Sequence, residues 1–125
     1  MVTGVPSHTQ VVVIGAGVAG SSVAYHLTKM GWRDVVLLER QTLASGTSGF
    51  AAGLVTQLRA SRTLTEISRY AVQLYADLEE ETGQSPGFKQ SGSVSVATEP
   101  GRMDEYRRIV SMGSAFGVDV RELSP

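Results

Sequence analysis

The stretch QVVVIGAGVAGSSVAYHLTKMGWRDVVLLER, residues Gln10 to Arg40, decides the fold class of this chain. An apolar run predicts a strand over 10–14, a helical pattern follows over 18–30, and a second apolar run predicts a strand over 35–39. Two strands joined by a helix lie parallel, because the helix carries the chain back to the start of the sheet. The stretch therefore predicts a βαβ unit.

Three glycines and one acid give this unit the pattern of a dinucleotide site. Gly15 permits a tight turn from strand to helix, Gly17 admits a pyrophosphate, and Gly20 lets the helix lie close to the strand. The first helix turn offers amide groups and the positive end of its dipole to the phosphates. Glu39 follows at about twenty residues, where a carboxylate accepts hydrogen bonds from a ribose and disfavours a 2′-phosphate. NAD and FAD share this ADP half, so the pattern leaves both cofactors open.

Length and composition restrict the possible classes of protein. The chain has 125 residues, enough for one domain at most, and we expect it to be the N-terminal part of a longer protein, truncated at its C-terminus. Lys plus Arg number 11 against 12 Asp plus Glu, which predicts no nucleic-acid partner. Cysteine is absent, and the isolated residues His8 and His26 have no metal-ligand neighbours, so we expect no metal site.

The ends and apolar runs of the sequence bear on location. Residues 1–9 read as a leader without the features of a secretory or organellar signal. No apolar run approaches the roughly twenty residues of a membrane span. We therefore expect a cytoplasmic protein with no membrane partner; its oligomeric state stays open.

The remaining chain predicts a loop, two helices and two further strands. Residues 41–53 are small and polar, which predicts a loop with a short helical turn, and a loop of this length is usually functional. Thr63 and Glu66 form a capping-box pattern for a helix that ends at Gly83. Its expected apolar stripe consists of Leu64, Ile67, Ala71, Leu74 and Leu78.

The C-terminal third predicts a strand, a helix and a short strand. Alternating valines and serines predict a half-buried strand over 92–98. Pro100 starts a helix that Gly117 ends, and two valines suggest a last strand over 118–120. The expected buried side of this helix consists of Met103, Tyr106, Ile109 and Val110.

In this order the features resemble the N-terminal part of the D-amino-acid oxidase-like FAD-dependent oxidoreductase superfamily, and within it the dimethylglycine and sarcosine dehydrogenase group. The resemblance covers nearly all of the chain after residue 9. It implies an α/β fold, in which a Rossmann-like FAD-binding βαβ unit and flavin loop (10–60) precede the start of an incomplete α+β substrate domain (61–125). The segments that carry it are GAGVAGSSVAYHL, VVLLER, SGTSGFAAGLVTQLRAS, YAVQLYADLEEETG, FKQSGSVSVAT and RMDEYRRIVSMGSAFGVDVRELSP.

The resemblance also implies which residues contact FAD. One sequence departure concerns Phe50, which stands where relatives that attach FAD covalently have histidine; we therefore expect noncovalent FAD. The implied contacts are Gly15, Gly17, Val18, Ala19 and Gly20 at the pyrophosphate, Glu39 and Arg40 at the ribose and adenine, and Thr47, Ser48, Gly49, Phe50 and Leu54 under the flavin.

The activity that the resemblance implies is FAD-dependent oxidation of a small secondary or tertiary amine, such as an N-methylated amino acid, by hydride transfer to the flavin. No catalytic residue can be assigned in this chain, and we expect the chain by itself to be inactive. Arg59 and Arg62 could face an anionic substrate, but solvated arginines at a helix start are a simpler interpretation. The alternatives are an NAD-dependent dehydrogenase, which would continue with further βα units after Glu39, and a noncatalytic nucleotide-binding fragment.

Overall fold

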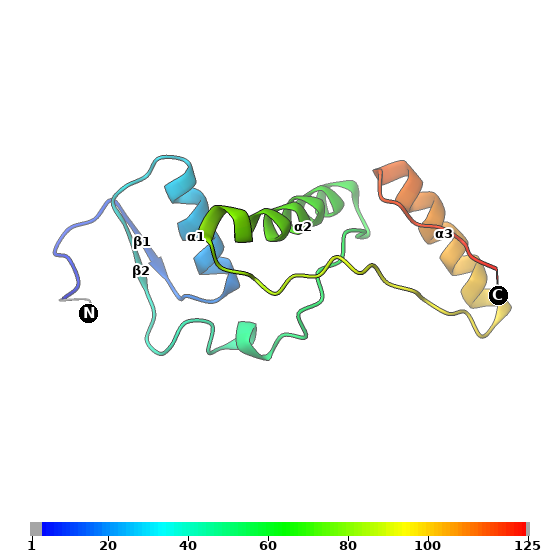
Figure 1. Cartoon of the computed structure of the whole chain (residues 1–125), viewed down its shortest axis with the longest axis horizontal. Coiled ribbons are helices and arrows are strands. Elements are labelled where there is room, and N and C mark those ends of the chain that lie inside the picture. The colour runs from blue at the N-terminus through cyan, green and yellow to red at the C-terminus, as the bar shows by residue number, and fades with distance from the viewer. Residues whose placement is uncertain (1–3, 125) are drawn as a thin grey trace. The chain divides into compact units, whose positions relative to one another are not determined.

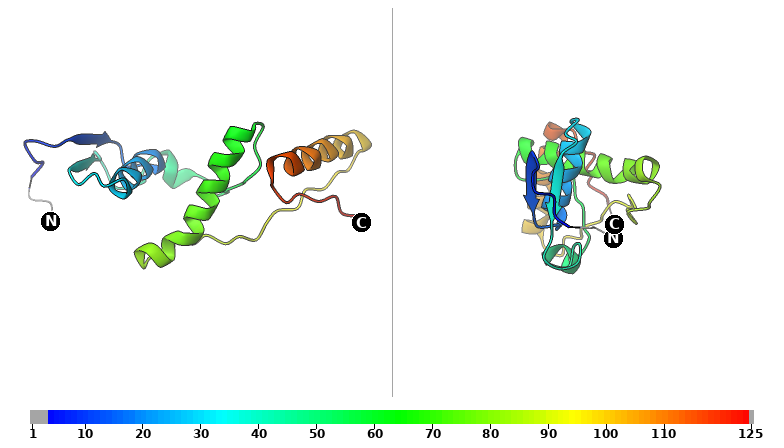
Figure 2. Two further views of the ribbon diagram at one scale, coloured as in Figure 1. Left: turned by 90° about the horizontal axis from the view of Figure 1, so that it is seen from above. Right: turned by 90° about the vertical axis from the view of Figure 1, so that its left-hand side faces the viewer.

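The N-terminal part of the chain forms the βαβ unit that the sequence predicts. In the computed structural model, which describes residues 4–124, β1 (Val11–Ile14) leads into α1 (Val18–Lys29) and then β2 (Val35–Leu38). The strands pair in parallel from Val11 opposite Val35 to Ile14 opposite Leu38, as a two-stranded sheet. Both ribbon views show α1 lying along the strands (Figures 1 and 2). The predicted fold class is confirmed.

Short polar contacts hold the beginnings of the two strands together. The carboxylate of Asp34, just before β2, accepts a hydrogen bond from Thr9 Oγ1 at 3.0 Å and one from the Gln10 N–H at 2.9 Å. Just after the C-terminal end of α1, Gly31 has a φ of 93°, a left-handed conformation that favours glycine. The chain therefore leaves α1 and enters β2 through a turn that the local sequence specifies.

After β2 the chain forms the predicted loop with one short helical turn. This turn is the 3-10 helix η1 (Thr47–Phe50), and the residues around it have no regular structure. Residues 4–9, the described part of the expected leader, have no helix or strand; residues 1–3 of that leader lie outside the described residues.

The two predicted helices are α2 (Arg62–Thr82) and α3 (Pro100–Phe116). Gly83 and Gly117 end them in left-handed conformations, as predicted. The predicted start of α2 is wrong: Ser61, not Thr63, is the N-cap, and its side chain accepts a hydrogen bond from the Leu64 N–H. The helix begins earlier because serine at this position satisfies a first-turn amide that has no intrahelical partner.

Both strands predicted for the C-terminal half are absent from the part of the chain that the structure describes. Residues 92–98 and 118–120 are irregular, and Figure 1 draws the segment between α2 and α3 as an extended ribbon without an arrow. Val94 and Val96 are 81% and 76% exposed. The alternating pattern suits a strand, but a strand forms only when a neighbouring strand supplies its hydrogen bonds.

The expected apolar stripe of α2 is also only partly buried. Leu64 and Ile67 are 53% and 60% exposed, whereas Val72 and Thr65 are the buried residues of this helix. A helix buries the face that meets another surface, and the pattern alone does not supply that surface. The four residues expected on the buried side of α3 are half-buried.

The chain divides into two compact units, Met1–Leu54 and Val55–Pro125. The first contains the sheet, α1 and η1, and the second contains α2 and α3. The division expected at residue 60 stays a prediction. No helix among residues 4–124 is long and apolar enough to cross a membrane.

Candidate dinucleotide site

The turn after β1 has the tight geometry that its glycines predict. Gly15 has a φ of 97°, and its N–H donates to the Leu38 carbonyl at 2.7 Å. A Cβ built on Gly20 would lie 1.8 Å from the Gly15 carbonyl oxygen, so α1 can begin this close to the turn only with glycine there. Ala16, between them, is 1% exposed. The turn therefore brings the N-terminus of α1 close to the ends of both strands.

The N-terminus of α1 presents backbone donors at this turn. Gly17 is the N-cap and makes no side-chain cap, and the first amides of a helix have no intrahelical partners. The Val18 N–H donates to Ser48 Oγ at 2.8 Å, so η1 supplies a cap from outside the helix. A Cβ on Gly17 would lie 3.2 Å from the same Ser48 oxygen. Because Gly17 has no side chain, the space between the N-terminus of α1 and Ser48 stays unfilled.

Glu39 is a half-buried carboxylate held by two backbone amides. Its Oε2 accepts from the Ala16 N–H at 2.8 Å, and its Oε1 accepts from the Gln41 N–H at 2.9 Å. The hydrogen bond from Ala16, followed by that from Gln41, lowers the pKa of Glu39 below its ordinary value. Glu39 is therefore ionised at neutral pH. Each carboxylate oxygen can accept a second hydrogen bond, so ribose hydroxyls can still bind there.

The loop after Glu39 is bound to the glycine turn. The Ala44 N–H donates to the Ala16 carbonyl at 3.0 Å, and Ala44 adopts a φ of 58°, which is uncommon for a residue other than glycine. A Cβ on Gly49 would lie 2.6 Å from the Ala44 carbonyl oxygen, so η1 packs closely against this loop. Strained backbone of this kind clusters at binding sites.

These elements enclose a pocket of about 500 Å³ at the end of the two strands where they meet α1. Its walls come from the ends of β1 and β2, the glycine turn and the following loop. Gly15, Gly17, Glu39 and Arg40, four of the sequence-predicted contacts, line it. The other lining residues are Ile14, Leu38, Gln41, Ala44, Ser45 and Gly46.

The remaining predicted contacts lie in the same unit but outside the pocket lining. Val18, Ala19 and Gly20 form the first turn of α1, and Thr47, Ser48, Gly49 and Phe50 form η1. Phe50 and Leu54 are 87% and 83% exposed. The individual loop residues Gln41, Ala44, Ser45 and Gly46 were not predicted, although the length of the loop marked the segment as functional.

The arginines and the helix histidine named in the sequence analysis contact residues outside the pocket lining. Arg59 Nε donates to Ser68 Oγ at 3.1 Å, and Arg62 Nη2 donates to the Ala115 carbonyl at 2.7 Å. The Nδ1 of His26 lies 2.6 Å from the Ser22 carbonyl oxygen within α1. Across residues 4–124 no group of three or more His, Cys, Asp or Glu side chains could hold a metal ion.

Comparison with protein families gives a match over nearly the whole chain. A family model described as FAD dependent oxidoreductase matches residues 10–125. The match begins one residue before β1 and includes the glycine turn, the loop and both helices of the second unit.

Individual relatives are similar to this chain over most of its length but are much longer proteins. The mitochondrial sarcosine dehydrogenase of Homo sapiens is 45% identical over 96% of this chain, which spans 13% of that protein. The mitochondrial pyruvate dehydrogenase phosphatase regulatory subunit of Mus musculus is 42% identical over 96% of this chain, which spans 14% of that protein. Among solved structures, L-proline dehydrogenase from P. horikoshii has a TM-score of 0.81 at 26% identity, covering 90% of this chain and 29% of that one.

Proposed function

Because the chain belongs to the FAD dependent oxidoreductase family, we propose that its protein binds FAD noncovalently at the glycine turn and oxidises a secondary or tertiary amine. The family indicates FAD rather than NAD as the cofactor. The observation that carries the site assignment is the pocket between Gly15, Gly17 and Glu39, where a helix N-terminus and an ionised carboxylate lie together.

The residues of the pocket fit the ADP half of FAD. A pyrophosphate suits the amides at the start of α1, where Gly17 leaves room that a side chain would fill. Ribose hydroxyls suit the free acceptor positions of Glu39, whose negative charge would repel a 2′-phosphate. Arg40 lines the same pocket, and we propose that it contacts the adenine side of FAD. These residues bind and orient the dinucleotide.

The amine substrate class follows from the substrates that two relatives are named for. Sarcosine and L-proline are both amino acids with a secondary amine nitrogen. Bound FAD supplies an acceptor for a hydride from the carbon beside that nitrogen, leaving an iminium that water hydrolyses to a carbonyl compound and an amine. An N-methylated amino acid is therefore the substrate we propose.

Anaerobic flavin reduction tests this proposal directly. The FAD-loaded protein is mixed with sarcosine, with dimethylglycine and, as a control, with glycine betaine, whose quaternary nitrogen has no lone pair to form an iminium. We expect loss of the flavin absorbance with one of the first two amines and none with glycine betaine. If a panel of secondary and tertiary amines leaves the flavin oxidised, the amine oxidation is wrong.

A single substitution tests the position of the cofactor. Gly17→Val places side-chain atoms where the pyrophosphate must approach and displaces Ser48, whose oxygen already lies 3.2 Å from the Cβ position. Losing phosphate hydrogen bonds worth about 1–3 kcal/mol each predicts that the protein no longer retains FAD. Stoichiometric FAD in purified Gly17→Val would place the cofactor elsewhere.

Noncovalent attachment has its own test at Phe50. This side chain is exposed and has no nucleophilic atom to bond to a flavin. We expect acid precipitation of the loaded protein to leave all of the yellow colour in the supernatant. Colour that stays with the precipitated chain would contradict noncovalent binding.

A regulatory role is a second candidate, because one relative is named as a regulatory subunit of a phosphatase. In that case the same pocket would hold FAD without substrate turnover. Retention of FAD together with oxidised flavin throughout the amine panel would favour this role over amine oxidation.

A further inference from the structure

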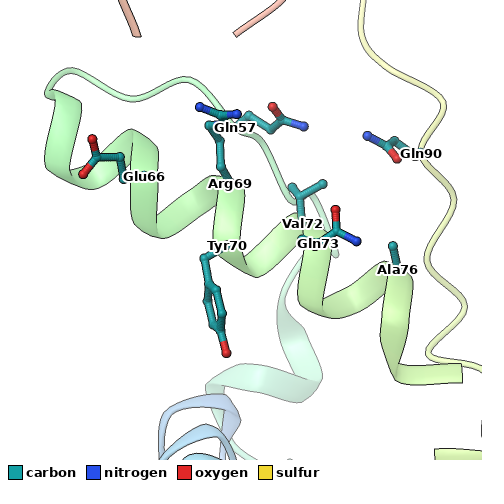
Figure 3. A pocket seen from close by; sticks show the side chains of 8 residues that line it. All are labelled: Gln57, Glu66, Arg69, Tyr70, Val72, Gln73, Ala76 and Gln90. Carbon is teal, nitrogen blue, oxygen red and sulfur yellow. The ribbon is translucent and has the colours of Figure 1, made fainter. Parts of the chain in front are cut away.

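A second pocket, of about 400 Å³, lies along α2, and all its lining residues belong to the unit Val55–Pro125. In Figure 3, Arg69 extends from the helix toward Gln57, Glu66 projects from the preceding turn on the side away from Gln90, and Tyr70 points in the opposite direction to Arg69. Three separate stretches of the chain therefore contribute polar side chains to one cavity, which is not part of the dinucleotide site.

The guanidinium of Arg69 is the main charged donor in this pocket. Arg59 and Arg62 donate to Ser68 and to the Ala115 carbonyl, but Arg69 has no hydrogen bond or ion pair among residues 4–124. Its Nη1 lies 3.3 Å from the Cβ position of Gly117, so a side chain there would crowd it. A planar guanidinium with uncommitted donors matches the geometry of a carboxylate.

Three glutamine side chains line the pocket together with Arg69: Gln57, Gln73 and Gln90. Gln73 Nε2 already donates one hydrogen to Asp77 Oδ1 at 2.8 Å, which leaves its second hydrogen available. Gln57 lies in a segment anchored by Thr65, which is fully buried: Thr65 Oγ1 accepts from the Arg59 N–H at 3.1 Å. Arg69 and these amides give the pocket side-chain donors suited to an anion, and a buried hydrogen bond holds the segment that carries Gln57.

Glu66 adds an acceptor of opposite charge. It lies one turn before Arg69 on α2 and lines the same pocket, yet the two side chains form no salt bridge. Its carboxylate makes no hydrogen bond with any other described residue, 4–124. A carboxylate beside an anion site attracts a ligand that carries a positive charge next to its negative one.

We propose that this pocket binds a small zwitterion of the size of an amino acid, with the ligand carboxylate on Arg69 and Gln57 and its ammonium group at Glu66. The site goes beyond the proposed function and does not depend on it, since it needs neither flavin nor turnover. Because all of these side chains are reached by solvent, we expect a dissociation constant of about 1 mM.

NMR titration of the flavin-free protein tests the site, with glycine as the probe. We expect saturable shifts of backbone signals in 66–76, about tenfold weaker binding of acetate, which lacks the ammonium, and no saturation by methylammonium. Arg69→Gln should weaken glycine binding at least tenfold, and Arg69→Lys by a few fold, because lysine keeps the charge but loses the fork geometry. Arg108→Gln, an equal charge change at an exposed position of α3, should leave binding unchanged.

Each other outcome overturns the proposal. If wild type and Arg69→Gln bind glycine equally, Arg69 does not bind the ligand carboxylate. If acetate binds as tightly as glycine, Glu66 does not bind the ammonium group. If Arg108→Gln also loses binding, the effect comes from net charge and not from this pocket. If Arg69→Gln changes the circular dichroism spectrum, the Arg69→Lys result decides in its place. None of these results alters the flavin tests above.

Discussion

The two units differ in where the partners of their elements lie. In Met1–Leu54 both strands pair with each other, α1 packs on them, and the loop is bonded to the glycine turn. In Val55–Pro125 both helices end at a left-handed glycine, but the extended segment between them pairs with no strand among the described residues. Local sequence signals are therefore sufficient where an element's partners lie within a few tens of residues.

One added methyl group in the first unit should give the largest loss of stability and of FAD binding among these substitutions. Gly20→Ala would put a Cβ 1.8 Å from the Gly15 carbonyl oxygen, so either α1 or the turn must move. Overpacking of this kind costs about 1–3 kcal/mol, and the N-terminus of α1 should lose its alignment with the pocket. Thermal unfolding and FAD retention measure the two consequences.

The matched control for this variant is Gly101→Ala. Gly101 lies in the first turn of α3, outside the pocket lining, and a Cβ there meets no atom within 4 Å. We expect unchanged FAD retention and no loss of stability. If both variants behave alike, close packing at Gly20 does not hold the turn.

In the second unit, Thr65 is the position we expect to matter most for stability. Thr65→Val keeps the shape but removes a hydroxyl that donates to the Ser61 carbonyl at 2.8 Å and accepts from the Arg59 N–H. Leaving such buried groups unpaired costs about 1–3 kcal/mol, measurable by denaturant unfolding. Exposed Thr63 provides the control: Thr63→Val should change the unfolding free energy little, and an equal loss would argue against the buried bond.

A smaller effect is expected from the charge of Glu39. Glu39→Gln keeps one acceptor oxygen but loses the negative charge that two backbone amides stabilise. We expect the first unit to unfold at slightly lower temperature at pH 7 and FAD to bind about tenfold more weakly by titration. Unchanged FAD affinity would remove Glu39 from the site.

The same residue predicts a pH dependence with a definite sign. Because the folded-state pKa of Glu39 is lowered, its contribution to stability is present above its ordinary pKa of 4.5 and is lost as the pH falls through the folded pKa. Glu39→Gln should therefore lose less stability than wild type when the pH is lowered below 4.5. Parallel stability curves for the two proteins would contradict this.

The smallest effect compares one carboxylate from each unit. The pKa of Asp119 is also lowered, but by the guanidinium of Arg121, at 2.8 Å on the exposed surface, whereas backbone amides lower the pKa of Glu39. At about 1 M salt, where the Debye length is about 3 Å, the Asp119 pKa should rise toward its ordinary value and that of Glu39 should change less. NMR titration of the two carboxyl groups at two salt concentrations measures both pKa values. Equal changes in the two pKa values would contradict the expected difference between them.

Much of the candidate site could be predicted from the sequence because its parts are close along the chain. Gly15, Gly17 and Glu39 line the observed pocket, as their spacing indicated. Ala44 and Ser45 could not be predicted, because neither residue type has a preference for such a site. Their position depends on how the loop folds back on the glycine turn, through the Ala44 hydrogen bond to Ala16.

By itself, the sequence determined the βαβ unit, the family and the ends of the helices at Gly83 and Gly117, since these depend on apolar periodicity and on conformations that glycine favours. Only the tertiary structure decided which surfaces are buried. It left 92–98 without a strand partner among residues 4–124, and it buried Val72 instead of Leu64 on α2. The physical reason is that hydrogen bonds between strands and burial of a helix face both need a partner surface, which no periodicity along one segment contains.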